Sequence, residues 1–363
     1  MKILILGNYD MGLYKFRKEL LEELIKRGHT VYVSIPNGEY ISKIKELGCK
    51  VIFTDIDRRG MNPLAEQKLY KTYCRIIKEV KPDKLLTYTI KPNIYGGLAA
   101  KKYRIPQIAN VTGLGTAIEN GGTKRKLILN LYKRGLSGAQ VVFFQNTENK
   151  DIFLKEKIIT GKYEIIPGSG VDLITHCYEP YPTNMNPLVF LIIGRIMKDK
   201  GIDEVIDAAR EIKSEYSNIL FRFIGFYDEE YQNKIELAEK NGLIEFLGKQ
   251  DNVHFFIKNS HATIHASYHE GMSNVLQETA AAGRPVLASN IPGCIEIFEP
   301  NVSGISFESK NSKDLVRAIK SFIELPYEKK AAMGFAGRLR MEKLFDRNIV
   351  INKYLEEIEK EVK

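Results

Sequence analysis

The segment KILIL (2–6) sets the fold of the first half of the chain. Its nearly continuous apolar run is typical of a β-strand that is buried on both faces of a parallel sheet. A glycine-containing loop, GNYDMG (7–12), follows, and an amphipathic helix is predicted near 13–27. The helix is expected to end at Gly28, because glycine is favoured just after a helix C-terminus.

The alternation of strand and helix continues to residue 145. Further strands are predicted at 30–35, 50–55, 84–88, 107–111 and 141–145, and further helices near 64–79, 93–103 and 123–136. Strands that alternate with helices indicate a parallel, doubly wound sheet with helices on both faces.

A second alternation begins after a turn-rich stretch. The stretch at 165–187 has four prolines and little periodicity, which suits an interdomain linker. LVFLIIG (188–194) restarts the pattern, with strands predicted near 219–224, 244–247, 262–265 and 285–288 and helices near 202–215, 229–241, 252–258, 274–283, 311–324 and 327–343.

The predicted fold class is α/β, with two Rossmann-like, doubly wound parallel-sheet domains that face a cleft. A length of 363 residues also favours two domains over one. We expect a first domain at 1–172, a linker at 173–187, a second domain at 188–340, and a C-terminal helix at 341–363 that packs back toward the first domain.

The composition excludes several classes of protein. The four cysteines are scattered without a CxxC pair, which argues against a disulfide framework or a structural zinc site and suits a reducing cytoplasm. The N-terminal apolar run is too short for a signal peptide, and no run approaches the ~20 residues that cross a bilayer. The protein is therefore expected to be soluble or peripheral to a membrane.

The net charge of +9 is unevenly distributed. Residues 1–172 carry 30 Lys and Arg against 17 Asp and Glu, a charge of +13, whereas residues 173–363 carry 24 against 28, a charge of −4. A basic first half favours an anionic partner such as a phosphate, a diphosphate or an acidic membrane surface. On charge alone, a solvated basic surface explains the asymmetry equally well.

The strongest local motif is HEGMSNVLQETAAAGRPVLAS (269–289). A loop containing Gly271 follows a predicted strand and leads into a helix that opens near Asn274, with Gln277 completing a capping-box-like start. Such a loop presents backbone N–H groups and the positive end of the helix dipole, which together form a site for a diphosphate.

Two glutamates, Glu270 and Glu278, flank this turn. Aimed at a diphosphate they would repel it, so we interpret them as acceptors for the hydroxyls of a sugar and of a ribose. In isolation, a turn cap and a surface charge would explain them better. The glycine loop, the helix start and the following strand favour the binding site.

A second motif is GRIMKDKGIDEVIDA (194–208). Arg195 and Lys200 lie in the loop after the first strand of the second domain, at the sheet edge where α/β proteins bind ligands. There they would grip phosphate oxygens and offset the charge of a leaving nucleoside diphosphate. Without the first motif, two solvated loop cations would be the better explanation.

The combination of Gly-Arg…Lys-Gly (194–201) with Glu-Gly…Glu (270–278) resembles the family 4 retaining glycosyltransferases of GT-B fold. The resemblance spans essentially the whole chain, because further segments stand in the expected order: NVTGLG (110–115), FFQN (143–146), IIPGSGVD (165–172) and IPGCIE (291–296). LYKFRKELLEEL (13–24) and RRGMNP (58–63) resemble the branch that builds capsule, O-antigen and protein-linked glycans on polyprenyl diphosphate.

The resemblance implies a role for each matching residue. Arg195, Lys200 and Glu270 would be the catalytic group, with the two cations on the diphosphate and Glu270 on the donor-sugar hydroxyls. Glu278 would bind the ribose. The remaining donor contacts would be Gly12, Leu13, Gly225, Gly248, Gly271, Met272, Ser273, Asn274 and Val275, with the base near Gly225 and the turn at 246–248.

The acceptor side is less well defined. Many relatives place a histidine of the N-terminal domain near the donor sugar, but NVTGLG has none and His29 stands at a helix end. The candidates on this side are Lys91, Thr112, Arg58 and Arg59. The resemblance implies retention by front-side displacement, without a metal or a cofactor beyond the UDP-sugar.

Three other patterns do not change this reading. His261, His265 and His269 recur four residues apart, but on a predicted strand this spacing does not form a zinc site. Asp55-Ile-Asp57 mimics a DxD motif far from the phosphate loop. The basic helix at 123–136 fits a core-packed helix and docking on an anionic leaflet about equally well.

The sequence thus predicts an enzyme that moves a hexose or N-acetylhexosamine from a UDP-sugar to a polyprenyl-diphosphate-linked saccharide. It is expected in the cytoplasm, on the inner face of the plasma membrane, with an anionic membrane surface but no nucleic acid as a partner. One alternative is a sugar-nucleotide epimerase of GT-B fold. Another is a non-catalytic module that binds nucleic acid or membrane through its basic half.

Overall fold

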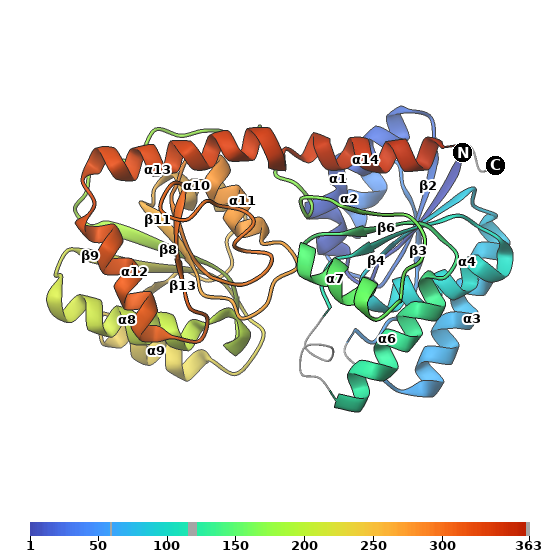
Figure 1. Cartoon of the computed structure of the whole chain (residues 1–363), viewed down its shortest axis with the longest axis horizontal. Helices are drawn as coiled ribbons and strands as arrows, with labels where there is room; N and C mark the ends of the chain where they lie inside the picture. Colours follow the sequence, from blue (N-terminus) through green and yellow to red (C-terminus); the bar gives the residue numbers. More distant parts are fainter. Residues whose placement is uncertain (59, 115–121, 361–363) are drawn as a thin grey trace. The chain divides into compact units, whose positions relative to one another are not determined.

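The computed structural model describes residues 1–58, 60–114 and 122–360. The chain forms two compact units. Unit 1 comprises Met1–Ser169 together with Val350–Lys363, and unit 2 comprises Gly170–Ile349. Each unit contains one parallel sheet with helices on both faces (Figure 1), so the predicted pair of Rossmann-like domains is confirmed.

Unit 1 is built on a seven-stranded sheet with the order β3-β2-β1-β4-β5-β6-β7. All neighbouring strands are parallel, and the direction of winding reverses between β1 and β4. The strands are β1 (Lys2–Leu6), β2 (Thr30–Ile35), β3 (Lys50–Phe53), β4 (Lys84–Tyr88), β5 (Gln107–Val111), β6 (Ala139–Phe144) and β7 (Tyr163–Ile165).

The apolar run of β1 is buried on both faces, as its sequence predicts. Ile3 and Ile5 pack into one core, whereas Leu4 and Leu6 pack into another, because successive side chains of a strand point to opposite faces. The helices of the first face are α1 (Asp10–Lys26), α2 (Ile41–Glu46) and α14 (Arg347–Glu359). Those of the second are α3 (Pro63–Val80), α4 (Gly97–Tyr103), α6 (Gly122–Leu136) and α7 (Thr147–Lys155).

Unit 2 repeats the plan with a six-stranded parallel sheet of order β10-β9-β8-β11-β12-β13, in which the winding reverses between β8 and β11. Its strands are β8 (Leu188–Ile196), β9 (Ile219–Tyr227), β10 (Glu245–Phe246), β11 (Ala262–His265), β12 (Val286–Ser289) and β13 (Gly304–Phe307).

The helices of unit 2 also divide between two faces. On one face lie α8 (Ile202–Glu215), α9 (Gln232–Lys240) and α12 (Ser312–Glu324). On the other lie α10 (Val253–Lys258) and α11 (Asn274–Ala281), and α13 (Tyr327–Arg340) contacts α11. A π-helical turn at Met341–Phe345 leads from α13 to α14.

Four short elements were not predicted from the sequence pattern. The helices α2 and α7 and the strands β7 and β13 are absent from the predicted set. These elements have nine residues or fewer, so they offer too little periodicity to be separated from loops. The helix α1 begins earlier than predicted, at Asp10, whose buried carboxylate accepts a hydrogen bond from the Tyr40 N–H at 2.8 Å.

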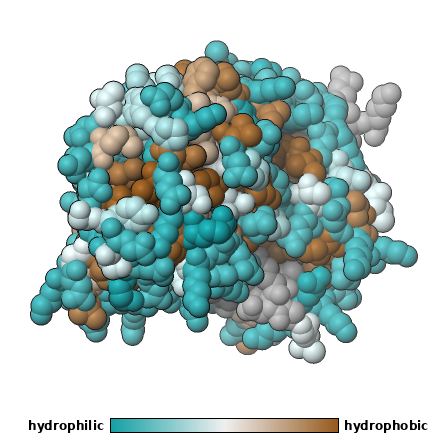
Figure 2. All heavy atoms as spheres, turned by 60° about the vertical axis from the view of Figure 1, so that its left-hand side comes forward, coloured by the Kyte–Doolittle hydropathy of each residue, from teal (hydrophilic) through white to brown (hydrophobic). Residues whose placement is uncertain are grey.

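The surface is mainly hydrophilic on the face drawn in Figure 2, with hydrophobic side chains gathered in smaller areas. Among the described residues, no helix combines the length and the apolar character that a membrane span requires.

Candidate active site

The loop after β8 meets the loop after β11 at the point where the winding of unit 2 reverses. Parallel α/β sheets bind ligands at the carboxyl ends of strands at such a point. Lys200 ends a single 3₁₀ turn, Lys198–Lys200, and Gly201 follows with φ +68°. A Cβ atom on Gly201 would lie 2.1 Å from the Ala266 carbonyl oxygen, so only glycine allows this close approach.

Lys200, His265 and Glu270 form a cluster between these two loops. The Lys200 ammonium forms an ion pair with Glu270 Oε1, and His265 Nε2 lies 2.9 Å from the same oxygen. Lys200 Nζ is also 3.4 Å from Ser267 Oγ, and the Tyr268 N–H donates to the Asp199 carbonyl at 2.9 Å. The sequence therefore predicted two members of one cluster from motifs 70 residues apart.

Glu270 is held in its ionised form. Burial alone would raise the pKa of its carboxyl, but the charge of Lys200 and the hydrogen bond from His265 outweigh burial and lower the pKa below its usual range. An ionised carboxylate accepts hydrogen bonds and donates none. Glu270 is therefore suited to receive hydroxyl groups and unsuited to act as a general acid.

The helix α11 begins where the motif predicts, but with a different cap. Ser273 is the N-cap, and its Oγ accepts a hydrogen bond from the Leu276 N–H at 3.3 Å. Asn274 is instead the first helical residue, so the predicted capping box of Asn274 with Gln277 is wrong. The Ser273 hydroxyl also lies 3.2 Å from His265 Nε2, which joins the helix start to the cluster.

The loop between Glu270 and α11 is shaped by Gly293. The Ser273 N–H donates to the Gly293 carbonyl at 2.8 Å. Gly293 has φ +80°, and a Cβ atom there would lie 2.7 Å from the Glu270 carbonyl oxygen and 2.8 Å from that of Gly271. The glycine therefore lets two loops pack together and fixes the backbone of the candidate site.

Arg195 lies beside the cluster but has its own carboxylate partner. Its Nη1 is 2.7 Å from Asp228 Oδ2, and its side chain is 41% exposed. Arg195 and Lys200 line the same small cavity of about 10 Å³, together with Gly194 and His265. That volume is about the space for one water molecule.

Gly225 lies near the end of β9, and Gly248 lies two residues after β10. The Gly225 N–H donates to the Gly248 carbonyl at 2.9 Å. Gly225 pairs in register with Gly194, and its Cβ would lie 1.7 Å from the Gly194 carbonyl oxygen. A side chain at Gly225 is therefore excluded by the packing of β9 against β8 beside Arg195.

The other predicted donor contacts occupy the loop and the first turns of α11. Met272 is buried in the core beneath the helix, and Gly271 and Val275 are half-buried. Asn274 Oδ1 is buried and lacks a hydrogen-bond partner among the described residues. Glu278 lies one turn further along α11, with its Oε1 3.9 Å from His176 Nε2.

In unit 1, the acceptor-side candidate Arg58 lies beside the start of the helix that contains two predicted donor contacts. The Arg58 guanidinium lies over the Tyr9 ring at 4.4 Å, and Tyr9 is the N-cap of α1, the helix that contains Gly12 and Leu13. Leu13 is buried in the core. Arg59 falls outside the described residues.

The remaining two acceptor-side candidates follow β4 and β5. Lys91 forms a largely buried ion pair with Glu66 at 2.5 Å, and Thr112 follows the end of β5. Lys91 is thus committed to a carboxylate in this structure, whereas Thr112 is half-buried.

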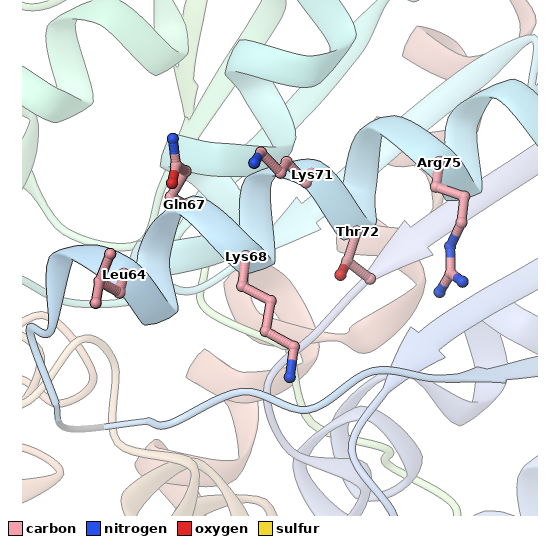
Figure 3. A pocket seen from close by; sticks show the side chains of 6 residues that line it. All are labelled: Leu64, Gln67, Lys68, Lys71, Thr72 and Arg75. Carbon is pink, nitrogen blue, oxygen red and sulfur yellow. The ribbon is translucent and has the colours of Figure 1, made fainter.

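A basic hollow on α3 was not predicted from the sequence. Its volume is about 320 Å³, and its lining comes from α3 alone: Leu64, Gln67, Lys68, Lys71, Thr72 and Arg75 (Figure 3). Lys68, Thr72 and Arg75 point the same way from successive turns of the helix. The helical spacing of these residues is visible in the sequence.

The structure separates the histidines whose spacing mimics a zinc site. His261 Nδ1 accepts a hydrogen bond from the Val189 N–H at 2.9 Å and its Nε2 is 2.8 Å from the Asn184 carbonyl, whereas His265 joins Glu270. The histidine spacing suggested His265 only as a metal ligand, so its contact with Glu270 was not predicted. Asp228 was also missed, and Gly293 was included only as part of the segment IPGCIE (291–296), without its contact to Glu270.

Two parallel Rossmann-like sheets, with a cation–carboxylate cluster at the winding reversal of the second, define a two-domain protein of GT-B type. The protein-family model described as "Glycosyl transferases group 1" matches residues 179–340, and the family model described as "Glycosyl transferase 4-like" matches residues 2–146. The two matches together cover most of the chain. The chain therefore belongs to the glycosyltransferases that these models describe, and it is a transferase.

Two similar proteins are named as transferases that act on diphospho-undecaprenol-linked acceptors. The N,N'-diacetylbacillosaminyl-diphospho-undecaprenol alpha-1,3-N-acetylgalactosaminyltransferase of Campylobacter jejuni is 27% identical, with 100% of each chain covered. The UDP-Gal:alpha-D-GlcNAc-diphosphoundecaprenol alpha-1,3-galactosyltransferase of Escherichia coli is 24% identical over 72% of this chain and 71% of the relative. These matches give no support to the epimerase alternative.

Solved structures agree on the fold. The Anabaena protein HepE, in complex with UDP-glucose, superposes with a TM-score of 0.79, 20% identity and 98% of each chain covered. At this level of identity the likeness concerns the fold alone.

Proposed function

We propose that this protein transfers a hexose or N-acetylhexosamine from a UDP-sugar to a polyprenyl-diphosphate-linked saccharide, with retention of configuration. The observation that carries the proposal is the cluster of Lys200, His265 and Glu270 at the winding reversal of unit 2. The names of the Campylobacter jejuni and Escherichia coli relatives, both of which specify diphospho-undecaprenol acceptors, support the acceptor class.

In this proposal the cations bind the diphosphate. Arg195 and Lys200 line one cavity, and each now neutralises a carboxylate, Asp228 or Glu270. A diphosphate would take over part of that pairing through charge-assisted hydrogen bonds. The positive end of the α11 dipole adds to the attraction, because anions are stabilised at helix N-termini.

The donor sugar and ribose would be held by oxygen acceptors. Glu270 is ionised and accepts sugar hydroxyls, and the buried Asn274 Oδ1 gains a donor that the described protein residues do not supply. Glu278, one turn further along the helix, would take the ribose hydroxyls. Gly271, Met272, Ser273 and Val275 would contribute backbone contacts, and the base would lie near Gly225 and the open space beside Gly248.

The chemical step we propose is a front-side displacement without a protein nucleophile. The bond between the anomeric carbon and the β-phosphate oxygen breaks, and the acceptor hydroxyl oxygen forms the new glycosidic bond on the same face. The acceptor proton passes to the departing phosphate oxygen. The protein supplies positioning and charge stabilisation, so this scheme needs no metal ion.

We place the acceptor in unit 1 and the lipid at an anionic membrane surface on the cytoplasmic side. The acceptor-side candidates are Lys91, Thr112, Arg58 and Arg59, and the donor contacts Gly12 and Leu13 of the same unit would approach both the diphosphate and the acceptor. The charge of +13 on residues 1–172, the basic helix α6 and the hollow on α3 favour anionic headgroups. Vesicle sedimentation with and without anionic lipid tests this part separately.

The donor proposal is tested by a thermal-shift screen of UDP-, GDP- and ADP-sugars. A ligand that binds the native state raises the melting temperature, so a UDP-sugar is expected to stabilise the protein more than the other two classes. The stabilising UDP-sugar is then incubated with a polyprenyl-diphosphate-linked saccharide, and a lengthened saccharide is expected. Equal shifts for all three nucleotides, or epimerisation of the UDP-sugar without an acceptor, would overturn the proposal.

A further inference from the structure

Cys177, Glu179 and His254 come together in unit 2, outside the Lys200–Glu270 cluster. His254 Nε2 lies 3.2 Å from Glu179 Oε1, and Cys177 Sγ lies 3.7 Å from that nitrogen and 3.9 Å from that oxygen. Glu179 and His254 are partly buried and Cys177 is exposed. One thiol, one carboxylate and one imidazole therefore converge on a single point at the surface.

The three distances match the edges of a metal coordination shell. A tetrahedral zinc ion bonded at about 2.0–2.3 Å holds neighbouring nitrogen, oxygen and sulfur ligands about 3.3–3.6 Å apart. The observed separations of 3.2, 3.7 and 3.9 Å need shifts of only a few tenths of an ångström. Thiolate and imidazole ligands favour zinc over magnesium or calcium, which prefer oxygen ligands.

The backbone around the triad is fixed by a buried arginine. Arg284 is only 1% exposed, and it donates to the carbonyls of Glu179 at 2.7 Å, Pro180 at 3.0 Å and Lys258 at 2.6 Å. Lys258 ends α10, the helix whose first turn contains His254. One guanidinium thus holds both ligand-bearing segments in place, which reduces the cost of assembling the ligands around an ion.

We propose that Cys177, Glu179 and His254 bind a zinc ion, with the fourth position left to water or to a ligand from solution. His254 Nδ1 is buried and has no hydrogen-bond partner among the described residues. Metal-bound histidines are usually anchored through that second nitrogen, and loss of the anchor weakens binding. The site is therefore an exchangeable zinc site and not a permanent structural one.

The site borders the proposed donor region without belonging to it. The His176 ring meets the His254 ring edge-on at 5.6 Å, and its Nε2 is 3.9 Å from Glu278 Oε1. Zinc binding does not depend on the proposed transferase function, so the two proposals can fail independently.

Zinc titration of the full-length protein tests the proposal. The protein is stripped with a chelator and titrated with zinc against a chromophoric competitor. We expect one equivalent to bind. Cys177→Ser, Glu179→Gln and His254→Asn are each expected to weaken binding by about 100-fold or more, since loss of a ligand costs more than loss of a supporting contact. Glu328→Gln, at an exposed glutamate of unit 2, is the matched control and keeps the affinity.

Cobalt substitution identifies the ligands directly. The wild-type protein is expected to show the thiolate-to-cobalt charge-transfer absorption of a bound cysteine, and Cys177→Ser is expected to lack it. Circular dichroism of the metal-free variants separates loss of ligands from loss of folding. The absence of zinc binding in the folded wild type, or unchanged affinity in Cys177→Ser and His254→Asn, would overturn the proposal.

Discussion

His265 Nε2 lies 2.9 Å from Glu270 Oε1, the same carboxylate oxygen that receives the Lys200 ammonium. One carboxylate therefore joins the loop after β8 to the end of β11. Two cationic or proton-donating partners on one oxygen keep the carboxylate ionised and fix its direction. In the proposed function, the Glu270 carboxylate accepts hydrogen bonds from the hydroxyl groups of the donor sugar.

The first prediction concerns the two cations. Arg195→Ala and Lys200→Ala are each expected to lower turnover by about 100-fold or more, because each removes charge stabilisation from the leaving diphosphate. Steady-state kinetics measures the loss, and circular dichroism checks folding. Lys198→Ala, an exposed lysine of the same turn, serves as the control. Near-normal turnover in both variants would exclude the phosphate role.

The second prediction concerns acid stability. The pKa of Glu270 is lowered in the folded state from an ordinary value of 4.5, despite the opposing effect of burial, so the ionised carboxylate contributes stability above pH 4.5. That contribution is lost as the pH falls below 4.5 and the unfolded state takes up the proton more readily.

Glu270→Gln is therefore expected to flatten the fall in melting temperature below pH 4.5, whereas the exposed Glu328→Gln is expected to keep it. Melting curves across the acid range make the comparison. Parallel profiles for Glu270→Gln and the wild type would contradict the assignment.

The third prediction concerns the close packing at Gly293. Gly293→Ala is expected to destabilise unit 2 by about 1–3 kcal/mol, because φ is +80° and the added Cβ would meet two carbonyl oxygens. The added Cβ is also expected to displace the loop at 270–273, and this displacement should weaken nucleotide-sugar binding. Gly242→Ala is the matched control, since Gly242 has φ +68° but nothing within 4 Å of the added atom. Equal affinity for the nucleotide sugar in both variants would refute the role of Gly293.

The fourth prediction concerns α14. Tyr354 is fully buried in the core of unit 1, and its hydroxyl oxygen accepts a hydrogen bond from Asn110 Nδ2 at 2.6 Å. Tyr354→Ala is expected to destabilise unit 1 by about 3–5 kcal/mol, the usual cost of deleting a buried aromatic ring. Hydrogen exchange should report the loss in β5 and β6, while unit 2 keeps its protection. The exposed Glu356→Ala is expected to behave as wild type, and matching protection in Tyr354→Ala would count against the contact.

Much of the candidate site could be predicted because it is local in sequence. The segment from Glu270 to Glu278 is a loop followed by a helix, and both the helix and its approximate start are confirmed. The choice of Ser273 over Asn274 as the cap could not be predicted, because both residue types are good caps and their backbone angles decide between them. The roles of the individual residues stay predictions.

The partners of the predicted residues could not be read from the sequence. Asp228 stands 33 residues from Arg195, and Gly293 stands far from Glu270, so no periodic pattern links either pair. The triad of Cys177, Glu179 and His254 was likewise hidden, because its ligands lack the spacing of a metal motif and meet only through the fold.

By itself, the sequence determined the two parallel-sheet domains, since apolar runs such as KILIL alternate with helices, and this pattern is typical of a parallel sheet covered by helices on both faces. It also determined the helix start that follows Glu270. Only the tertiary structure decided that Lys200, His265 and Glu270 share one oxygen. The physical reason is the order of strands: reversal of the winding between β8 and β11 makes neighbours of two loops that are far apart along the chain.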